Sequence, residues 1–288
     1  MMKYLYYISL FLLMVACSDD EIRSPKIPYA FIPDTAVYSP SLEGYTLVHD
    51  YSFGKLRKVK SLDDLAEYFE PYGVAGTIVI NEEWQRYKPF NDRNHHFTDT
   101  TLQLIAYADG GIKAGGISSG QFATKKTFYP SDGKTLLIQL RCKIPKGTGL
   151  WPAFWMYSPG GEGTTSSEID IFEFYNGPNL TTYDWVGGNG GKGDGADYHS
   201  IMTGEWEWTS GFDFADQYHT FTAIWKEGDV QKWVDTTFVR GSNFDWYGPA
   251  PQVIVNLALG GKPISDPKPV ATPFPAIFHI DFLRIYEK

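Results

Sequence analysis

The sequence contains little cysteine and little positive charge. Cys17 and Cys142 are the only cysteines in 288 residues, and they form neither a CxxC spacing nor a His/Cys cluster, so nothing indicates a disulfide framework or a zinc site. The net charge of −9 argues against nucleic acid as a partner, because a nucleic-acid-binding surface needs clustered Lys and Arg. Charged residues make up 20% of the chain, which is too few for a disordered protein.

Helical periodicity is also scarce. The chain shows no series of amphipathic helices, which argues against a parallel α/β fold, and it shows no repeat of fixed period. The best helical candidate is Leu62–Phe69, with Ser61 as its N-cap. The segment Leu180–Phe214 is the least regular, and we expect it to be a long loop that borders a binding cleft.

Short runs of β-branched and aromatic residues take the place of helices, separated by Gly, Asp, Asn or Pro. These runs are Thr77–Ile80, Leu102–Tyr107, Phe122–Phe128, Leu136–Ile144, Trp151–Tyr157, Ser166–Tyr175, Thr220–Lys226, Lys232–Asp235, Gln252–Leu259 and Phe278–Tyr286. Many short strands with turn signals between them predict an all-β sandwich.

The N-terminus has the pattern of a targeting segment. Lys3 precedes the apolar run Tyr4–Val15, which is too short to span a bilayer, and the run ends at a sequence that resembles a bacterial lipobox before Cys17. We predict a lipoprotein signal peptide over residues 1–16, lipidation of Cys17, and an acidic, proline-rich tether over residues 17–44. The expected location is the outer membrane or cell surface of a Gram-negative bacterium, with contact to the membrane through the lipid anchor only. The alternative is an ordinary secretory peptide.

Three carboxylates lie in the apolar run Ser166–Tyr175, namely Glu168, Asp170 and Glu173. Alternate side chains of a strand share a face, so Glu168 and Asp170 lie together. Glu173 joins them only if a β-bulge adds one residue around positions 171 and 172. A solvated acidic face is the ordinary alternative. Clustered acids among large apolar residues repel one another and lose hydration, which raises the pKa of at least one, and acid catalysis uses such an arrangement.

Trp151, Ala153 and Trp155 occupy alternate positions, so their side chains share one face of a strand. Phe154 and Met156 then face the core. Indole rings in these positions either pack in the core or form a platform on which the flat faces of sugar rings stack.

The acid motif resembles the bulged signature of glycoside hydrolase family 16. Further segments resemble segments of the family and follow one another in the order that the family has. They are Gly149–Met156, Tyr218–Trp225, Trp233–Asp235, Val255–Gly261 and Ile280–Tyr286. The first of them resembles the laminarinase-like members. The resemblance covers roughly residues 45 to 288, and it implies that this range is a catalytic domain. The implied fold is a two-sheet β-jelly-roll of the concanavalin type with a concave substrate cleft.

The resemblance also implies roles for individual residues. Glu168 matches the nucleophile, Glu173 matches the general acid that later acts as base, and Asp170 lies between them. Trp151 and Trp155 become sugar-stacking residues of the cleft. The other candidates for substrate contact are Asn94, Gln121, Asp184 and Trp185. Here the chain departs from the family, since Gln121 stands where Arg is frequent and Thr182–Trp185 stands where a His is usual.

We therefore expect a retaining endo-acting glycoside hydrolase that cleaves internal β-glycosidic bonds of a polysaccharide, with β-1,3- or mixed-linked β-glucan as the first choice. The alternatives are an endo-hydrolase of agar-type or mucin-type β-galactan, a transglycosylase, and a non-catalytic glycan-binding surface lipoprotein. The protein is expected to be a monomer without a cofactor. Some family members hold a structural calcium through a C-terminal Asp that Asp281 resembles, but the matching N-terminal carboxylate is not evident near Tyr51–Phe53, so no metal is expected.

Overall fold

The computed structural model describes residues 39–73, 81–158, 166–175, 180–187, 206–208, 213–261 and 272–288, with the backbone alone for 181–187 and 206–208. Cys17, most of the expected tether and the expected strand Thr77–Ile80 lie outside the described residues. In the part of the chain that is described, no helix is both long and apolar enough to cross a membrane.

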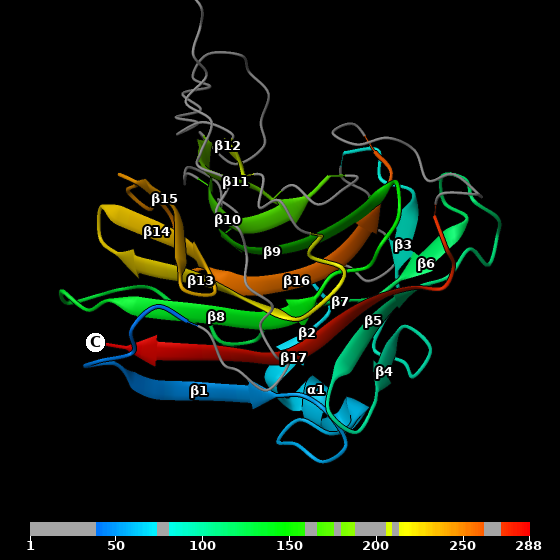
Figure 1. The fold of residues 1–288 in the computed structure, drawn as a ribbon, viewed down its shortest axis with the longest axis horizontal. Coiled ribbons are helices and arrows are strands. Elements are labelled where there is room, and N and C mark those ends of the chain that lie inside the picture. The colour runs from blue at the N-terminus through cyan, green and yellow to red at the C-terminus, as the bar shows by residue number, and fades with distance from the viewer. Residues whose placement is uncertain are drawn as a thin grey trace, which may run out of the picture.

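Two antiparallel sheets form the body of the protein (Figure 1). The first sheet has the order β15-β14-β13-β8-β17-β5-β4, and β1 also pairs with β17. Its strands are β1 (Thr46–Ser52), β4 (His95–Phe97), β5 (Leu102–Ala106), β8 (Leu136–Lys143), β13 (His219–Lys226), β14 (Asp229–Val234), β15 (Thr237–Ser242) and β17 (Ala276–Glu287). The N-terminal and C-terminal strands of the domain therefore lie side by side.

The second sheet has the order β12-β11-β10-β9-β16-β7-β2, and its strands β9 and β16 curve visibly in Figure 1. Its strands are β2 (Phe69–Glu70), β7 (Gln121–Thr124), β9 (Leu150–Ser158), β10 (Ser166–Phe174), β11 (Leu180–Gly187), β12 (Trp206–Trp208) and β16 (Gln252–Leu259). A short parallel pair, β3 (Gln85–Tyr87) and β6 (Ile117–Ser119), stands beside them. The two-sheet all-β sandwich predicted from the sequence is confirmed.

Aromatic side chains join the two sheets. The ring of Phe172, on β10, lies 4.4 Å from that of Phe221 on β13 and 6.4 Å from that of Phe278 on β17, measured between centroids. Phe154 on β9 packs beside Phe172 at 5.9 Å. These rings are fully buried in one continuous apolar cluster, so the acid strand is fixed from behind by the core of the sandwich.

The single described helix, α1 (Leu62–Tyr68), begins and ends close to its predicted bounds. The hydroxyl of Ser61 accepts a hydrogen bond from the backbone N–H of Asp64 at 3.2 Å, as an N-cap residue should. Leu65 is its buried residue, and the other face is open to solvent. The helix is short and peripheral, and it leads directly into β2.

Most predicted strands are found within one to three residues of their expected bounds, but two expectations are wrong. The strand expected over Phe122–Phe128 ends at Thr124. The segment Leu180–Phe214, expected to be an irregular loop, starts with the strand β11 and contains β12, which pair with each other and extend the second sheet. Pairing with β10 supplies the backbone hydrogen bonds that an irregular segment would lack.

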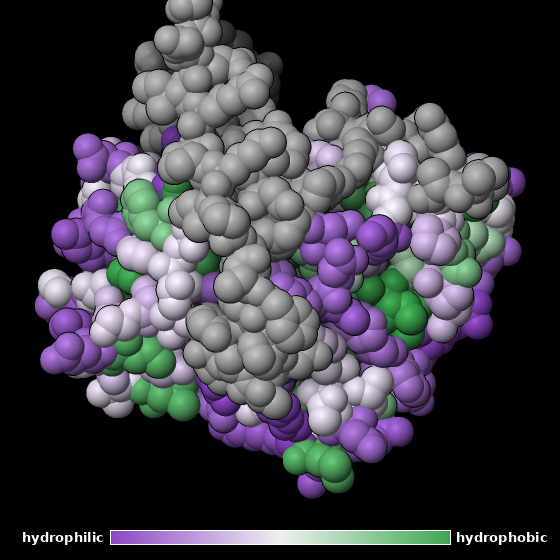
Figure 2. All heavy atoms as spheres, viewed as in Figure 1, coloured by the Kyte–Doolittle hydropathy of each residue, from purple (hydrophilic) through white to green (hydrophobic). Residues whose placement is uncertain are grey.

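Polar and apolar residues are mixed over the face drawn in Figure 2, with the apolar ones in small separate groups. The large hydrophobic side chains that the described residues expose are Leu47, Val48, Leu56, Phe238 and Tyr247. Scattered apolar residues of this kind are ordinary on a folded protein.

Candidate active site

The acid strand β10 carries the predicted bulge. Against β11, Asp170 pairs with Tyr183 and Glu173 pairs with Thr181, so three steps on β10 match two on β11. The extra residue returns Glu173 to the face of Glu168 and Asp170, and all three carboxyl groups line one cavity in the second sheet. Asp170 and Glu173 are 2% and 5% exposed, whereas Glu168 is half-buried. The bulge hypothesis is therefore confirmed.

Both carboxylate oxygens of Glu173 accept hydrogen bonds. The indole N–H of Trp151 donates to Oε1 at 2.8 Å, and the hydroxyl of Tyr175 donates to Oε2 at 2.7 Å. The two aromatic rings meet edge to face, with centroids 5.3 Å apart. Donors on both oxygens fix the orientation of the carboxyl group, which is what a group that transfers a proton to a defined atom requires.

A second hydrogen-bonded series lies on the neighbouring strands. The indole N–H of Trp155 donates to Oδ1 of Asn256 on β16 at 2.7 Å, and Nδ2 of Asn256 donates to the hydroxyl of Tyr87 at 2.9 Å. Because the amide oxygen and nitrogen of Asn256 each have a partner, its orientation is fixed. All three side chains line the cavity, so this series builds its floor.

An aromatic group stands at the Glu168 end of the cavity. The ring of Tyr72 meets Trp155 edge to face at 5.5 Å, and Tyr157 lies 5.8 Å from Trp155. Burial, and then the neighbouring Tyr157 and Glu168, raise the pKa of the Tyr72 hydroxyl, which therefore stays protonated. Trp155 is half-buried and is thus the more open of the two tryptophans. Open aromatic rings beside a carboxylate form a surface suited to a sugar ring.

A fourth carboxyl group reaches the cavity from outside the acid strand. Glu83 lies before β3, is 5% exposed, and lines the cavity together with Asn81. Burial raises the pKa of the Glu83 carboxyl to about 7, the charge of Glu173 raises it too, and hydrogen bonds from Gln85 and Asn81 lower it in part. Near neutral pH both the protonated and the ionised form of Glu83 are therefore populated.

The cavity is strongly acidic. Glu83, Glu168, Asp170 and Glu173 line it, and the described lining contains no Lys, Arg or His. The rest of the described lining is amide or aromatic apart from two alanines. Such a surface repels anions and offers hydrogen-bond acceptors to hydroxyl groups.

The structure brings three of the predicted contact residues to the cavity. Trp151, Trp155 and Gln121 line the cavity, and Phe154 and Met156 face the core. The side-chain amide of Gln121 donates to the backbone carbonyl of Tyr72 at 2.8 Å. Trp151 is only 5% exposed, so its ring orients Glu173 more than it offers an open stacking face.

Asn94 is a correction. It is 2% exposed and does not line the cavity, and its amide nitrogen donates to the carbonyl of Ile105 at 2.8 Å. The residue therefore ties the turn before β4 to β5 and has a structural role. The side chains of Asp184 and Trp185 lie outside the described part of the chain, although their backbone pairs with β10.

Five polar residues of the cavity were not predicted as site residues, namely Tyr72, Asn81, Glu83, Tyr87 and Asn256, and neither was Tyr175, which donates to Glu173. Tyr175 lies two residues after Glu173, and Asn256 lies in a segment that resembles the family, but nothing in the sequence indicated their roles. Glu83 and Tyr87 had no local signal. They reach the cavity only because the segment around β3 packs against the end of β16, where the N–H of Trp84 donates to the carbonyl of Leu259 at 2.7 Å.

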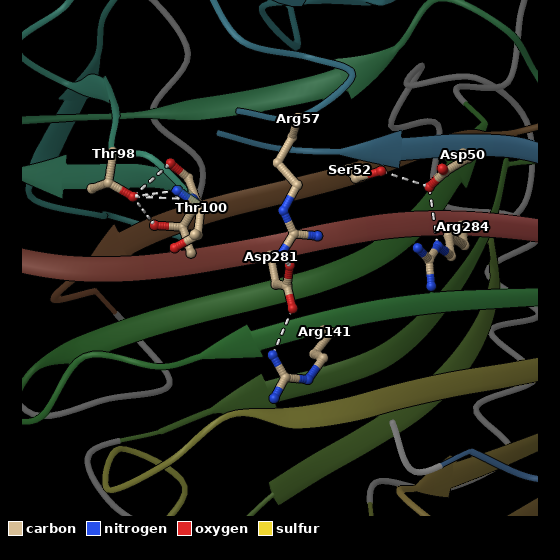
Figure 3. Close-up of polar contacts among 9 residues, drawn as sticks. Asp50, Ser52, Arg57, Thr98, Thr100, Arg141, Asp281 and Arg284 are labelled. Atoms are coloured by element: carbon tan, nitrogen blue, oxygen red, sulfur yellow. Dashed lines mark hydrogen bonds and ion pairs between the residues drawn. The ribbon is translucent and has the colours of Figure 1, made fainter. Parts of the chain in front are cut away.

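Asp281, on the first sheet, does not fit the role of a calcium ligand. Its Oδ2 lies 2.5 Å from Nη1 of Arg141, and its Oδ1 lies 3.2 Å from Nη2 of Arg57, so two guanidinium groups hold the carboxylate (Figure 3). A calcium ion needs several oxygen ligands and is repelled by cations. Among the described residues, no group of three or more His, Cys, Asp or Glu side chains could hold a metal ion.

Comparison with known proteins gives a consistent result. The model of the family "Glycosyl hydrolases family 16" matches residues 84–269. Glucan endo-1,3-beta-glucosidase A1 of Niallia circulans is 29% identical over 191 residues, which are 59% of this chain and 26% of that protein. Glucan endo-1,3-beta-glucosidase of Cryptopygus antarcticus is 30% identical over 206 residues, 63% of this chain and 71% of that protein. The chain thus spans about a quarter of the first of these relatives.

A solved structure agrees with the sequence comparisons. The endo-beta-1,3-glucanase from Pyrococcus furiosus superposes with a TM-score of 0.62 at 27% sequence identity, covering 84% of this chain and 94% of that one. The match extends over nearly the whole of the other domain, so the two-sheet architecture is shared and not only the acid strand.

Proposed function

Because the chain belongs to the glycosyl hydrolases family 16, we propose that it is a retaining endo-β-glycanase that cleaves internal bonds of β-1,3- or mixed-linked β-glucan. The observation that carries the proposal is the bulged strand β10, which presents three carboxyl groups to one cavity. The glucanases among the relatives support the choice of glucan.

In the proposed first step, the carboxylate of Glu168 attacks the anomeric carbon of the bound sugar. Glu173 gives its proton to the glycosidic oxygen as the bond from that oxygen to the anomeric carbon breaks, and a glycosyl ester forms on Glu168. Trp151 and Tyr175 hold Glu173 in the orientation that this transfer needs. Asp170 lies between the two glutamates on the same face, and its charge helps Glu173 to keep its proton before attack.

In the second step, Glu173 is a carboxylate and accepts a proton from a water molecule that attacks the anomeric carbon. The ester bond breaks and Glu168 leaves as a carboxylate, so each carboxyl group returns to its starting state. Two displacements at one carbon restore the β configuration. The hydrogen bonds from Trp151 and Tyr175 stabilise the ionised form of Glu173 that the second step uses.

The substrate is proposed to be uncharged near the scissile bond. A sulfate or carboxylate on the sugar would meet up to four carboxyl groups, and the described lining offers no cation to compensate. Neutral hydroxyl groups, in contrast, find acceptors on the acids and amides, and the half-buried ring of Trp155 offers a stacking surface.

The direct test measures reducing ends released from β-1,3-glucan, mixed-linked β-glucan, β-1,4-galactan and agar by wild-type protein and by Glu168→Gln. We expect release from a β-glucan that falls at least 1000-fold in the variant, because an amide cannot form the glycosyl ester. If reducing ends are released fastest from a galactan, then galactan and not glucan is the substrate. Binding without release from any polymer would favour the glycan-binding alternative, and loss of less than tenfold in Glu168→Gln would refute the nucleophile.

We propose further that the domain is a monomer held at the bacterial cell surface by a lipid on Cys17, with residues 1–16 removed and residues 17–44 as tether. The test expresses the full chain in a Gram-negative host and separates membrane from soluble fractions. Wild type should fractionate with membranes and Cys17→Ala should be soluble, while Cys142→Ala, which removes a buried cysteine of the domain, serves as control. A soluble wild type that starts at another residue would contradict the anchor.

A further inference from the structure

Glu83 comes from a segment far from the acid strand in the sequence, yet it faces the same cavity as Glu173. It precedes β3, and this segment packs against the end of β16, two strands away from β10 in the second sheet. The same end of β16 pairs with β9 at Leu150 and Trp151, and the indole of Trp151 donates to Glu173 at 2.8 Å. Glu83 therefore stands at the Glu173 end of the cavity.

The backbone before Glu83 is strained. Asn81 and Glu82 both have left-handed conformations, with φ of 54° and 59°. Non-glycine residues in this region cost about 1 kcal/mol or more each, and they persist only where the surroundings impose them. Strain of this kind gathers at sites where a side chain must be presented in one position, and here the side chain that follows is Glu83.

Two glycines at the end of β16 make room for this turn. A Cβ on Gly260 would lie 2.7 Å from the ring of Trp84, and a Cβ on Gly261 would lie 2.6 Å from the carbonyl oxygen of Asn81. Both distances are too short for any larger residue. The turn and the glycine pair thus fit together closely and fix where Glu83 begins.

The side chain of Glu83 is fixed as well. Nε2 of Gln85 donates to Oε2 of Glu83 at 2.5 Å, and Oε1 of Gln85 accepts from the backbone N–H of Leu259 at 2.8 Å. Because a backbone N–H occupies the amide oxygen of Gln85, its amide nitrogen must face Glu83. A carboxyl group held in advance in one orientation binds a ligand without the entropy cost of ordering it.

We propose that Glu83 contacts the substrate, forming a hydrogen bond to a hydroxyl group of the sugar bound beside Glu173, and that this contact contributes to the choice among neutral β-glycans. The inference rests on the proposed function and names a determinant of its specificity. In the described part of the chain no cation pairs with Glu83, so a purely structural role would bury a carboxyl group at a cost that an amide or apolar residue would avoid. A carboxyl group can accept from a sugar hydroxyl when ionised and also donate when protonated.

The test measures binding and cleavage separately. The probe is a hexasaccharide of whichever polymer the wild type cleaves fastest, and its Kd is measured by calorimetry in the inactive Glu168→Gln background. Adding Glu83→Ala should weaken binding about 10- to 100-fold, and adding Glu83→Gln less than tenfold, because an amide still accepts and donates. Glu82→Gln is the matched control, since it removes the same charge from the exposed neighbouring residue, and it should change Kd less than twofold.

The second readout keeps the inference testable if Glu83→Ala does not fold. Glu83→Gln in the otherwise wild-type protein should change the ratio of kcat/KM for β-1,3-glucan and mixed-linked β-glucan at least threefold, mainly through KM, with an unchanged melting temperature at pH 5. An unchanged ratio would refute the role of Glu83 and leave the proposed function intact. The same holds if a folded Glu83→Ala binds the hexasaccharide with a Kd within twofold of that of the Glu168→Gln background. A wild type that neither cleaves nor binds any polymer would refute the proposed function, and the role of Glu83 with it.

Discussion

Replacing Glu83 by Gln should change how the stability of the protein depends on pH. The folded-state pKa of Glu83 is about 7, against an ordinary value of 4.5, and burial is the largest cause. An acid with a raised pKa binds its proton more tightly in the folded state. Its contribution to stability is therefore complete below pH 4.5 and is lost as the pH rises through 7.

The size of this loss follows from the two pKa values. Each pKa unit corresponds to about 1.36 kcal/mol, so the rise from 4.5 to about 7 corresponds to about 3 kcal/mol between pH 4.5 and pH 8. The Gln side chain has nearly the same shape and does not titrate. It can still accept the hydrogen bond from Gln85, so most of the local structure should survive.

The assay is urea denaturation of wild type, Glu83→Gln and Glu82→Gln at pH 5 and pH 8. The free energy of unfolding of Glu83→Gln relative to wild type should rise by about 2–3 kcal/mol between the two pH values, because the wild type then loses stability that the variant keeps. The exposed Glu82→Gln should show no such rise. A difference between Glu83→Gln and wild type that stays the same at both pH values would show that Glu83 is not held protonated by burial.

Three further predictions concern other parts of the molecule. Phe172→Ala should lower the free energy of unfolding by about 3–5 kcal/mol in urea denaturation, because the ring fills the contact between the sheets; a loss below 1 kcal/mol would contradict that packing. Trp151→Phe removes the donor to Oε1 of Glu173 and should lower kcat about tenfold with little change in KM, whereas an unchanged kcat would remove Trp151 from the orientation of the acid. A chelator should leave the melting temperature of the wild type unchanged while Arg141→Ala lowers it, since Arg141 and Arg57 neutralise Asp281; a lower melting temperature in chelator would overturn this interpretation.

The parts of the fold that the sequence predicted are those with strong local signals. The spacing of Glu168, Asp170 and Glu173 brings all three to one face only with a bulge, because a regular strand turns Glu173 to the opposite face, and the structure has that bulge. The alternation around Trp151 and Trp155 likewise fixed which side chains face the cavity. Periodicity and charge within one strand raised both possibilities, and the resemblance to the family decided between the alternatives.

The parts that were missed depend on contacts between distant segments. Leu180–Gly187 mixes Thr, Tyr, Asp and Trp without clean alternation, and it becomes a strand because β10 and β12 offer pairing partners. Asn94 was assigned to the substrate, but its amide is used by Ile105, eleven residues later. Glu83 reaches the cavity because its segment packs against the end of β16, so no pattern near position 83 reveals it.

Retention of configuration at the anomeric carbon is the property that most directly separates the proposed double displacement from other routes. It can be measured by proton NMR of the anomeric signals during the first minutes of hydrolysis of a β-1,3-glucan oligosaccharide by the wild type. Attack by Glu168 with Glu173 as acid and base predicts that β-configured reducing ends appear first and α-configured ends only later, by mutarotation. If α-configured reducing ends appear before β-configured ones, the roles assigned to Glu168 and Glu173 are contradicted.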